Sequence, residues 1–353
     1  MNRCSVGLVG CGSIATTHAR VLKDLADEAL LTACADKDPQ RAQHFASQHS
    51  CRVMPPEELY SSPEIDLIVI CTPSGHHAVA ALAALNAGKD VLLEKPLETS
   101  PAKALPLFEA RQRSGRLASV VSQHRFDPDA IRLRNVAASG ELGRLFGADI
   151  QIPWYRTQEY YEECDWRGTV ELDGGCLPNQ GIHTLDLMLW IMGPVKRLWA
   201  LNQVAVHQHI EAYDHVVATL EFTSGAVGNL MCSTAIHPGY PAKLSLWGSN
   251  GSAILEGDSL QSLAIQGQET RVGQALPSGW NVATGGTRAA QSTDSSVPQW
   301  KWGDAHRAQW RDVLTSRRTA QQPAVTLEDG LLALRVIEAV HQSARTGEVC
   351  ELD

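Results

Sequence analysis

The stretch Ser5-Val6-Gly7-Leu8-Val9-Gly10-Cys11-Gly12-Ser13-Ile14-Ala15 decides the fold. An apolar run typical of a buried strand leads into a glycine turn, and an amphipathic helical pattern follows. Glycines with the spacing G-x-G-x-x-A in this context let the backbone approach a pyrophosphate and turn the first amides of the helix toward it. We therefore expect Gly10, Gly12, Ser13 and Ile14 to bind a dinucleotide cofactor.

The same alternation of short apolar strands and amphipathic helices continues to residue 122. Such alternation places parallel strands side by side with crossover helices on both faces. The sequence therefore predicts an α/β Rossmann domain, a doubly wound parallel sheet, over residues 1–122. The expected strands are Ser5–Gly10, Leu30–Ala35, Cys51–Met54, Leu67–Cys71, Asp90–Glu94 and Leu117–Ser122, and the expected helices are Ile14–Leu25, Pro39–His49, His76–Ala87 and Pro101–Ser114.

Asp36 follows the second expected strand, 21 residues after Ala15. A carboxylate at this place accepts hydrogen bonds from the adenosine ribose and repels a 2′-phosphate, so it favours NAD over NADP. Lys37 and Arg41 leave NADP as the less favoured alternative.

Polar residues follow three further strands of the expected sheet. Ligands of doubly wound sheets bind beyond the carboxyl ends of the strands. Partial burial of Lys95, which lies between a carboxylate and a proline, would lower its pKa toward the range useful for proton transfer. The residues expected to line the cofactor site here are Thr72, Pro73, His77, Glu94, Lys95 and Gln123.

The sequence pattern changes in residues 123–353, where one helical stretch is followed by longer, consecutive strand-like runs. This order predicts an α+β domain around a large open, mostly antiparallel sheet, which binds substrate and carries the oligomer contacts. Gln266–Val297 lacks periodicity and is expected to form hairpins with a mobile loop, and the helix Leu327–Thr346 is expected to pack back on the first domain. The other expected elements are the helices Asp129–Ser139 and Asp304–Thr315 and the strands Phe146–Trp154, Val195–Val206, His215–Phe222, Ala226–Ala235, Lys243–Trp247 and Ala253–Glu256.

Composition argues against several classes of function. The net charge of −9 gives no large positive field for nucleic acid or anionic lipid, so neither partner is expected. No apolar stretch is long enough to cross a membrane, and the N-terminal one is too short for a signal peptide. The nine cysteines form no C-x-x-C pair and fit reduced core residues of a cytoplasmic protein. No metal site is expected.

Several motifs together resemble the Gfo/Idh/MocA family of nicotinamide-dependent sugar oxidoreductases along essentially the whole chain. The resemblance implies that Lys95 assists catalysis and that the Lys95–Pro96 bond is often cis. The second-domain motifs are similar to the branch of UDP-N-acetyl-2-amino-2-deoxyglucuronate (UDP-GlcNAcA) 3-dehydrogenases, from which Cys176-Leu177-Pro178 departs. The motifs are Gly10-x-Gly12-x-x-Ala15, Thr72-Pro73, Ala87-Gly88-Lys89-Asp90-Val91, Glu94-Lys95-Pro96, Gln123-His124-Arg125-Phe126-x-Pro128, Gly140-Glu141-Leu142-Gly143, Trp166-Arg167-Gly168-Thr169, Asp173-Gly174-Gly175 and Asn179-Gln180-Gly181-Ile182-His183.

Oxidation of a secondary alcohol needs a base at the hydroxyl while the hydride passes to the nicotinamide. Lys95 and His183 are the candidates, and their roles of base and polarising ammonium could be exchanged. Asn179, four residues before His183, would orient a sugar hydroxyl or cap the helix that follows. Asp186 could orient the ring of His183.

The resemblance and the residue chemistry together predict an NAD-dependent dehydrogenase acting at a secondary hydroxyl, C3 of a UDP-sugar acid such as UDP-GlcNAcA. The alternatives are a dehydrogenase of a free sugar or cyclitol, an NAD-dependent glycosidase on the same fold, and a non-catalytic NAD-binding sensor. The apolar-alternating face of the second sheet predicts a homodimer or homotetramer. The residues expected to bind substrate are Lys95, Arg125, Tyr160, Trp166, Arg167, Asn179 and His183, with Arg156 and Tyr161 beside them.

Overall fold

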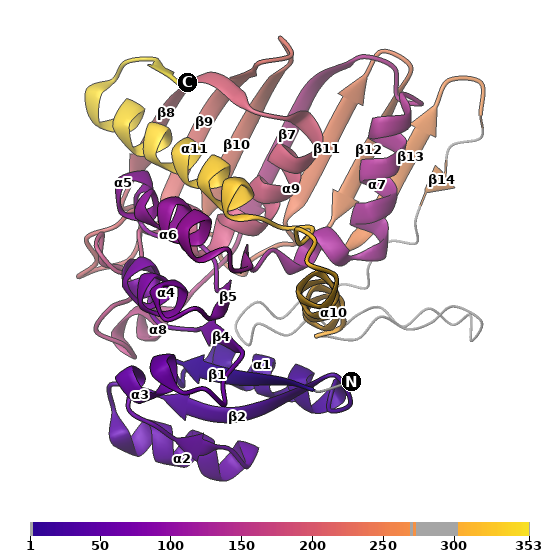
Figure 1. Cartoon of the computed structure of the whole chain (residues 1–353). Helices are drawn as coiled ribbons and strands as arrows, with labels where there is room; N and C mark the ends of the chain where they lie inside the picture. Colours follow the sequence, from indigo (N-terminus) through magenta and orange to yellow (C-terminus); the bar gives the residue numbers. More distant parts are fainter. Residues whose placement is uncertain (1–2, 269–270, 273–302, 353) are drawn as a thin grey trace. The chain divides into compact units, whose positions relative to one another are not determined.

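The computed structural model describes residues 3–268, 271–272 and 303–352 (Figure 1). The chain forms two compact units. The first unit comprises Met1–Gln123 and Gly303–Leu334, and the second comprises His124–Trp302 and Arg335–Asp353. The first unit thus includes residues that the sequence analysis groups with the second domain.

The first unit is built on a six-stranded parallel sheet with the order β3-β2-β1-β4-β5-β6. This order reverses between β1 and β4, the switch point at which doubly wound sheets bind their ligands. The predicted Rossmann fold is confirmed. The strands are β1 (Cys4–Val9), β2 (Ala29–Ala35), β3 (Arg52–Val53), β4 (Leu67–Ile70), β5 (Asp90–Leu93) and β6 (Ala118–Val120), and the helices between them are α1 (Ser13–Asp24), α2 (Pro39–His49), α3 (Pro56–Ser61), α4 (His77–Asn86), α5 (Pro101–Ala104) and α6 (Pro106–Ser114).

Two hydrophobic cores cover the two faces of this sheet. Successive residues of β4 alternate between them, because side chains along a strand point to opposite faces. Leu67 and Val69 belong to the core that contains α1 and α2, and Ile68 and Ile70 belong to the core that contains α4 and α6. The late helix α10 (Asp304–Thr319) adds the fully buried Trp310 to the first of these cores. The start of α11 (Leu327–Thr346) adds Leu327 and Leu334 to the second, so the boundary between the units falls within α11.

The second unit is built on a nine-stranded sheet with the order β14-β13-β12-β11-β7-β10-β9-β8-β15. All neighbouring strands are antiparallel except β7 and β10, which are parallel. The predicted mostly antiparallel sheet is confirmed. The strands are β7 (Leu145–Pro153), β8 (Val195–Gln203), β9 (His215–Phe222), β10 (Val227–Ser233), β11 (Lys243–Gly248), β12 (Gly251–Glu256), β13 (Ser259–Ile265), β14 (Arg271–Val272) and β15 (Cys350–Glu351).

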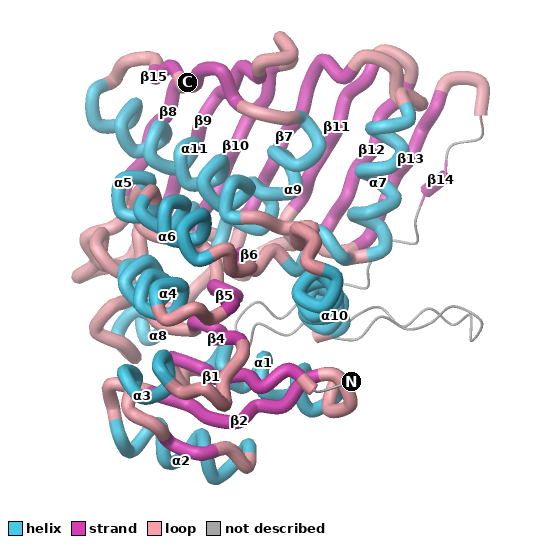
Figure 2. The backbone as a smooth tube through the Cα atoms, viewed as in Figure 1, coloured by secondary structure: helices cyan, strands magenta, loops and turns pink. Residues whose placement is uncertain are grey.

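Helices α7 (Pro128–Ser139) and α9 (Ile182–Met192) cover one face of this sheet, α7 over β12 and β13 and α9 over β7 and β11 (Figure 2). The short helix α8 (Gln158–Glu162) follows β7. The last part of α11 is tied to β8, because the hydroxyl of Ser343 accepts a 3.0 Å hydrogen bond from the amide of Ala200. The strand β8 ends at Gln203, earlier than predicted, because Asp214 accepts the amides of Ala205 and Val206 in a turn.

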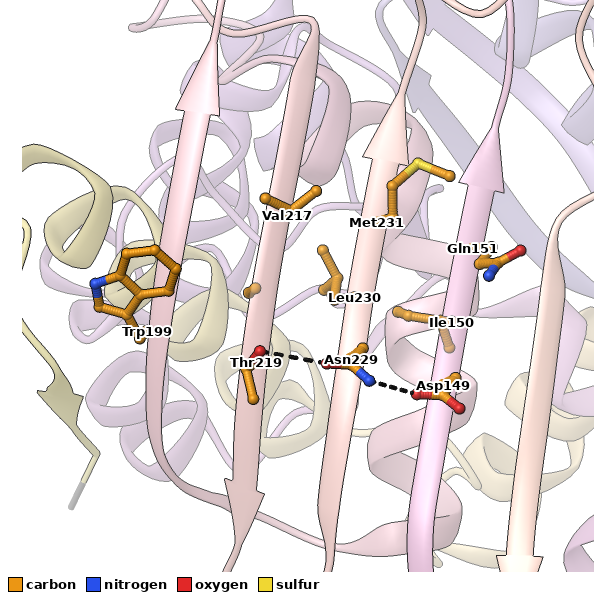
Figure 3. Close-up of a pocket in the computed structure, with 10 residues that line it drawn as sticks. Asp149, Ile150, Gln151, Trp199, Val217, Thr219, Asn229, Leu230 and Met231 are labelled. Carbon is orange, nitrogen blue, oxygen red and sulfur yellow. Dashed lines mark hydrogen bonds between the residues drawn. The ribbon is translucent and has the colours of Figure 1, made fainter.

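The opposite face of the nine-stranded sheet carries a ladder of polar side chains (Figure 3). The Asn229 amide donates 2.9 Å to Asp149, and Thr219 and Asn229 are joined by a 3.2 Å hydrogen bond. Together with Trp199 and Met231, these side chains line a shallow hollow of about 380 Å³. Trp199 keeps 41% of its surface exposed, so a large aromatic side chain faces outward here.

The segment Gln266–Val297, predicted to form hairpins with a mobile loop, lies mostly outside the described residues. Its described beginning follows the antiparallel pair β12 and β13. In the described part of the chain, no helix combines the length and the apolar character needed to cross a membrane.

Candidate active site

The glycine turn between β1 and α1 has the geometry that a pyrophosphate requires. Gly10 has φ +94°, and a Cβ there would lie 2.6 Å from the carbonyl oxygen of Cys71, so the turn packs tightly against the end of β4. A Cβ on Gly12, in contrast, would meet no atom within 4 Å. Gly12 is the N-cap of α1 and has no capping side chain, which leaves the first amides of this helix for an anion.

Asp36 holds this turn in place. Its Oδ2 accepts a 2.7 Å hydrogen bond from the amide of Cys11, and its Oδ1 accepts a 2.9 Å bond from the amide of Asp38. An ionised carboxylate offers about four acceptor positions, so Asp36 keeps capacity for ribose hydroxyls. The cap of α2 is formed by Asp38, which accepts the amides of Gln40 and Arg41.

Three buried polar atoms of the first unit have no hydrogen-bond partner among the described residues: His49 Nε2 on α2, and Thr72 Oγ1 and Gln123 Oε1 beyond the ends of β4 and β6. Proteins rarely leave buried polar atoms unpaired, because each costs the free energy of its lost hydration. Both oxygens accept hydrogen bonds, and the nicotinamide carboxamide is a donor of matching chemistry. The residues predicted from the strand ends therefore fit the cofactor.

His77 connects the segments that follow β4 and β5. Its Nδ1 lies 2.7 Å from the carbonyl oxygen of Pro96, and its Nε2 lies 2.9 Å from that of Thr72. The ring is 1% exposed, and burial lowers its pKa although both carbonyl contacts favour the charged form. His77 thus positions the loop that carries Lys95. The Lys95–Pro96 peptide is cis.

A hydrogen-bonded chain fixes the carboxylate of Glu94. His18 Nε2 lies 2.8 Å from Glu94 Oε1, and the amide of Lys95 donates 3.1 Å to Oε2. Trp310 donates 2.9 Å to the other ring nitrogen of His18. Burial alone would raise the pKa of Glu94, but the hydrogen bond from His18 and nearby positive groups lower it to about 2. A buried carboxylate anion therefore stands beside the backbone of Lys95.

In the second unit, His183 is the second residue of α9 and follows a π-helical turn over Leu177–Gly181. Turns of this kind occur often at functional sites. A Cβ on Gly181 would lie 2.7 Å from the sulfur of Cys232, so this turn packs closely on β10. Cys176 and Cys232 each point their sulfur at the other's carbonyl oxygen, which makes Cys176 a packing residue.

Asn179 lies inside the π-helical turn and donates its side-chain amide to Asp173. The N-cap of α9 is Gly181, so the interpretation of Asn179 as a helix cap is wrong. The turn inserts ahead of α9 and moves the helix start past Asn179. The carbonyl oxygen of the Asn179 side chain accepts a 3.3 Å hydrogen bond from Gln180, which belongs to the polar cluster described next.

Two guanidinium groups stack on Tyr160. The Arg167 carbon Cζ lies 4.1 Å from the centre of the Tyr160 ring, and that of Arg156 lies 5.4 Å from it. Gln180 connects the cluster to the π-helical turn, since it accepts a 2.7 Å bond from Arg156 and donates 3.0 Å to the Tyr160 hydroxyl. Arg167 Nε is buried without a partner among the described residues. The Cζ atom of Arg167 also lies 5.6 Å from the ring centre of Trp166, another residue that the sequence predicts to bind substrate.

Arg125, predicted to bind substrate, is engaged inside the protein. Its Nε and Nη2 donate to the two carboxylate oxygens of Asp186 at 2.8 and 2.6 Å, and both side chains are buried. Such a two-bond pair fixes the planes of both groups. Its place is therefore between η2 (Gln123–Phe126) and α9, where it holds the helix that carries His183.

His18 is absent from the residues that the sequence predicts for the site, and His124 and Gln180 appear there only within motifs, with no role assigned to them. His18 follows Ile14 by four residues on α1, a spacing that places both on one side of the helix, and this signal could have been read. The partner of His18, Trp310, is 292 residues away, and no local pattern indicates that contact.

Comparisons with known proteins agree with this geometry. Residues 4–122 match the model of the oxidoreductase family with an NAD-binding Rossmann fold, and residues 130–254 match the GFO/IDH/MocA C-terminal domain. The dTDP-3,4-didehydro-2,6-dideoxy-alpha-D-glucose 3-reductase of Saccharopolyspora spinosa is 30% identical over 71% of this chain and 74% of its own length. The scyllo-inositol 2-dehydrogenase (NADP(+)) IolW of Bacillus subtilis is 24% identical over 96% of this chain and 93% of its own.

Among solved structures, the WlbA dehydrogenase of Bordetella pertussis, in complex with NADH and UDP-GlcNAcA, superposes with a TM-score of 0.85. It is 25% identical and covers 100% of this chain and 99% of its own. These matches join both units of the chain in one family, with the cofactor that the glycine turn predicts. The chain belongs to the Gfo/Idh/MocA family of NAD-binding oxidoreductases, whose members include sugar and inositol dehydrogenases acting on CH–OH groups.

Proposed function

We propose that this protein is an NAD-dependent dehydrogenase that oxidises the C3 hydroxyl of a nucleotide-linked sugar acid such as UDP-GlcNAcA. The carrying observation is the stack of Arg156 and Arg167 on Tyr160, in the same unit as His183. Arg167 Nη1 already pairs with Glu163 at 2.8 Å, but its Nε has no partner among the described residues. Two guanidinium groups beside aromatic rings suit a carboxylate or diphosphate and a planar base. The likeness to WlbA, crystallised with UDP-GlcNAcA, supports this substrate class.

In this proposal Gly12 and Asp36 would hold NAD, which would supply the hydride acceptor for C3. His183 takes the hydroxyl proton, and Lys95 holds the oxygen as an ammonium donor, or the two residues exchange these roles. Asn179, fixed by Asp173, orients a neighbouring sugar hydroxyl without adding charge. Glu94 and His77 keep the backbone around Lys95 in place.

A free sugar or cyclitol is the second candidate substrate, because the scyllo-inositol dehydrogenase matches 96% of this chain. A cyclitol is uncharged and has no use for the two arginines of the Tyr160 stack. The two candidates therefore differ in how strongly they depend on Arg167.

The test compares kcat/KM for UDP-GlcNAcA, for UDP-GlcNAc, which lacks the carboxylate, and for scyllo-inositol, in the wild type and in Arg167→Gln. We expect UDP-GlcNAcA to be the best substrate and Arg167→Gln to lower its kcat/KM by about tenfold to a hundredfold, as loss of a charged hydrogen bond predicts. Arg52→Gln, at an exposed ion pair on the first unit, is the matched control. Turnover of inositol alone, unaffected by Arg167→Gln, would establish the cyclitol enzyme instead.

The proposal includes a homodimer or homotetramer in the cytoplasm. Trp199 and Leu201 lie exposed on β8, and Val227 is exposed on the same face of β10. A sheet face with several exposed large apolar side chains is covered by another subunit in many proteins. The nine cysteines are all free, which suits a reducing compartment. Light scattering should give a dimer or tetramer for the wild type and a smaller species for Trp199→Asp; a wild-type monomer at micromolar concentration would contradict the proposal.

A further inference from the structure

His124 lies directly against the candidate catalytic histidine. The rings of His124 and His183 meet edge to face, with centres 5.1 Å apart and planes at 84°. His124 comes from η2, at the start of the second unit, and His183 comes from α9. At this distance a positive charge on one imidazole makes it harder to protonate the other, because charge–charge interactions are only partly screened inside a protein.

Asp127 holds His124 in a fixed orientation. Its Oδ2 lies 2.6 Å from Nδ1 of the ring, and its own side chain is 5% exposed. A carboxylate only accepts hydrogen bonds, so Nδ1 of His124 carries a proton. The other ring nitrogen, Nε2, lies on the side of the ring away from Asp127. His124 itself is 39% exposed, so that it can exchange a proton with solvent.

The charged groups around His124 favour its imidazolium form. The partial burial of the ring opposes a charge on it, but the hydrogen bond to Asp127 and the charges of Asp127, Asp258 and Asp186 raise the pKa of His124. Asp258 lies in the turn between β12 and β13, and burial and the neighbouring Asp127 raise its pKa. Asp186 on α9 is paired with Arg125, so its charge is largely offset.

We propose that His124, held by Asp127, is a positioning residue that sets the proton affinity of His183. The inference rests on His183 being the acid/base of the proposed function. A cation 5.1 Å away opposes a second positive charge, so His183 stays neutral and able to accept a proton at lower pH than it otherwise would. The ion pair thereby widens the pH range over which the base is ready for the substrate hydroxyl.

The experiment titrates the histidine rings of the full-length protein by NMR with ¹³C-labelled histidine. Wild type, His124→Gln and Asp127→Asn are compared, and His183→Ala assigns the signal. Removing the cation, or the carboxylate that keeps it charged, should move the His183 midpoint upward by roughly half a unit to one unit. His44→Gln, a substitution on the surface helix α2, should leave the midpoint in place.

The acid limb of kcat/KM should move upward with the NMR midpoint in both variants. An unchanged His183 midpoint in folded His124→Gln and Asp127→Asn would overturn the proposal, even if both variants lose thermal stability. A downward shift would overturn it as well. The NMR midpoint needs no turnover, so the coupling is tested even if the proposed substrate proves wrong, whereas full activity of His183→Ala refutes the catalytic assignment alone.

Discussion

Trp310 on α10 donates a 2.9 Å hydrogen bond to Nδ1 of His18 on α1, between residues 292 positions apart. An indole nitrogen only donates, so Nδ1 of His18 is an acceptor and its proton lies on Nε2. That proton points to Glu94 at 2.8 Å, and Glu94 in turn accepts the amide of Lys95. A tryptophan far along the chain therefore fixes which tautomer supports the carboxylate beside Lys95.

Trp310→Phe and His18→Leu should destabilise the first unit to different extents. Loss of the indole donor leaves one buried acceptor unpaired and should cost about 1–3 kcal/mol of unfolding free energy. Loss of His18 leaves the buried Glu94 anion without its hydrogen-bond donor and should cost more, about 3 kcal/mol or above, because an unpaired buried charge is costlier than an unpaired neutral acceptor. Urea unfolding measures both, and the double variant should fall short of the sum because the residues share one network. Strict additivity would contradict the chain of bonds.

Gly10→Ala and Gly12→Ala form a matched pair that separates folding from cofactor binding. At Gly10 a methyl group meets Cys71 at 2.6 Å and a positive φ, so Tm should fall by several degrees. At Gly12, with φ −81°, a methyl group meets nothing within 4 Å, so Tm should stay within about 2 °C. NAD affinity of Gly12→Ala should nevertheless drop by about tenfold or more, because the methyl group obstructs the pyrophosphate. Fluorescence titration and calorimetry provide the two readouts, and wild-type affinity in Gly12→Ala would contradict the cofactor assignment.

Lys95→Met and His183→Ala should each lower kcat by about two or more orders of magnitude, because each removes a group that handles the substrate proton. The NAD dissociation constant should stay within a few-fold of the wild type, since the glycine turn and Asp36 are untouched. Stopped-flow kinetics with saturating NAD give the rate, and equilibrium titration gives the affinity. A variant that keeps the normal rate excludes its residue from the mechanism.

The buried pair of His207 and Asp214 should make stability depend on pH. His207 lies 2.8 Å from Asp214 through Nδ1 and 2.8 Å from the carbonyl oxygen of Arg156 through Nε2, so the charged ring donates to both. Burial opposes both charges, but these hydrogen bonds raise the pKa of His207, and the bonds from His207 and three backbone amides lower the pKa of Asp214. The contribution of His207 is full below its unfolded pKa and is lost as pH rises through the folded one; that of Asp214 is present above its unfolded pKa and is lost as pH falls through the folded one.

The pair should therefore stabilise the fold most between about pH 4.5 and 6.5. The difference in Tm between wild type and His207→Gln should be largest near the middle of this range and shrink toward pH 9. Calorimetry from about pH 4.5 to pH 9 measures this difference in Tm, and the exposed His209→Gln serves as the control. A difference that grows toward pH 9 would mean that the ring is neutral in the folded protein.

The sequence predicted the Rossmann unit well because each of its signals is local. The glycine turn, Asp36 and the polar strand ends follow from adjacent residues, and the strand order places them along one edge of the sheet. The parallel pairing of β7 with β10 could not be foreseen, because consecutive strands favour antiparallel neighbours and the two are separated by about seventy residues.

The roles of individual site residues were harder to predict. In the sequence, Arg125 is a candidate to bind an anionic group of the substrate. In the structure its guanidinium pairs with Asp186, a contact that depends on tertiary packing and has no local sequence signal. The π-helical turn that moves Asn179 out of the cap position has no sequence signature of its own. Trp310 shows no functional pattern, and its place depends on α10 joining the first unit.

The central claim is that this protein transfers hydride from C3 of a nucleotide-linked sugar acid to NAD. The most direct test incubates the full-length protein with NAD and UDP-GlcNAcA deuterated at C3, then analyses the sugar and the extracted cofactor by mass spectrometry. The account predicts that deuterium appears in the reduced cofactor while the sugar loses its C3 deuterium and the hydroxyl hydrogen. Unchanged UDP-GlcNAcA with NAD bound, in protein that oxidises scyllo-inositol, would contradict it.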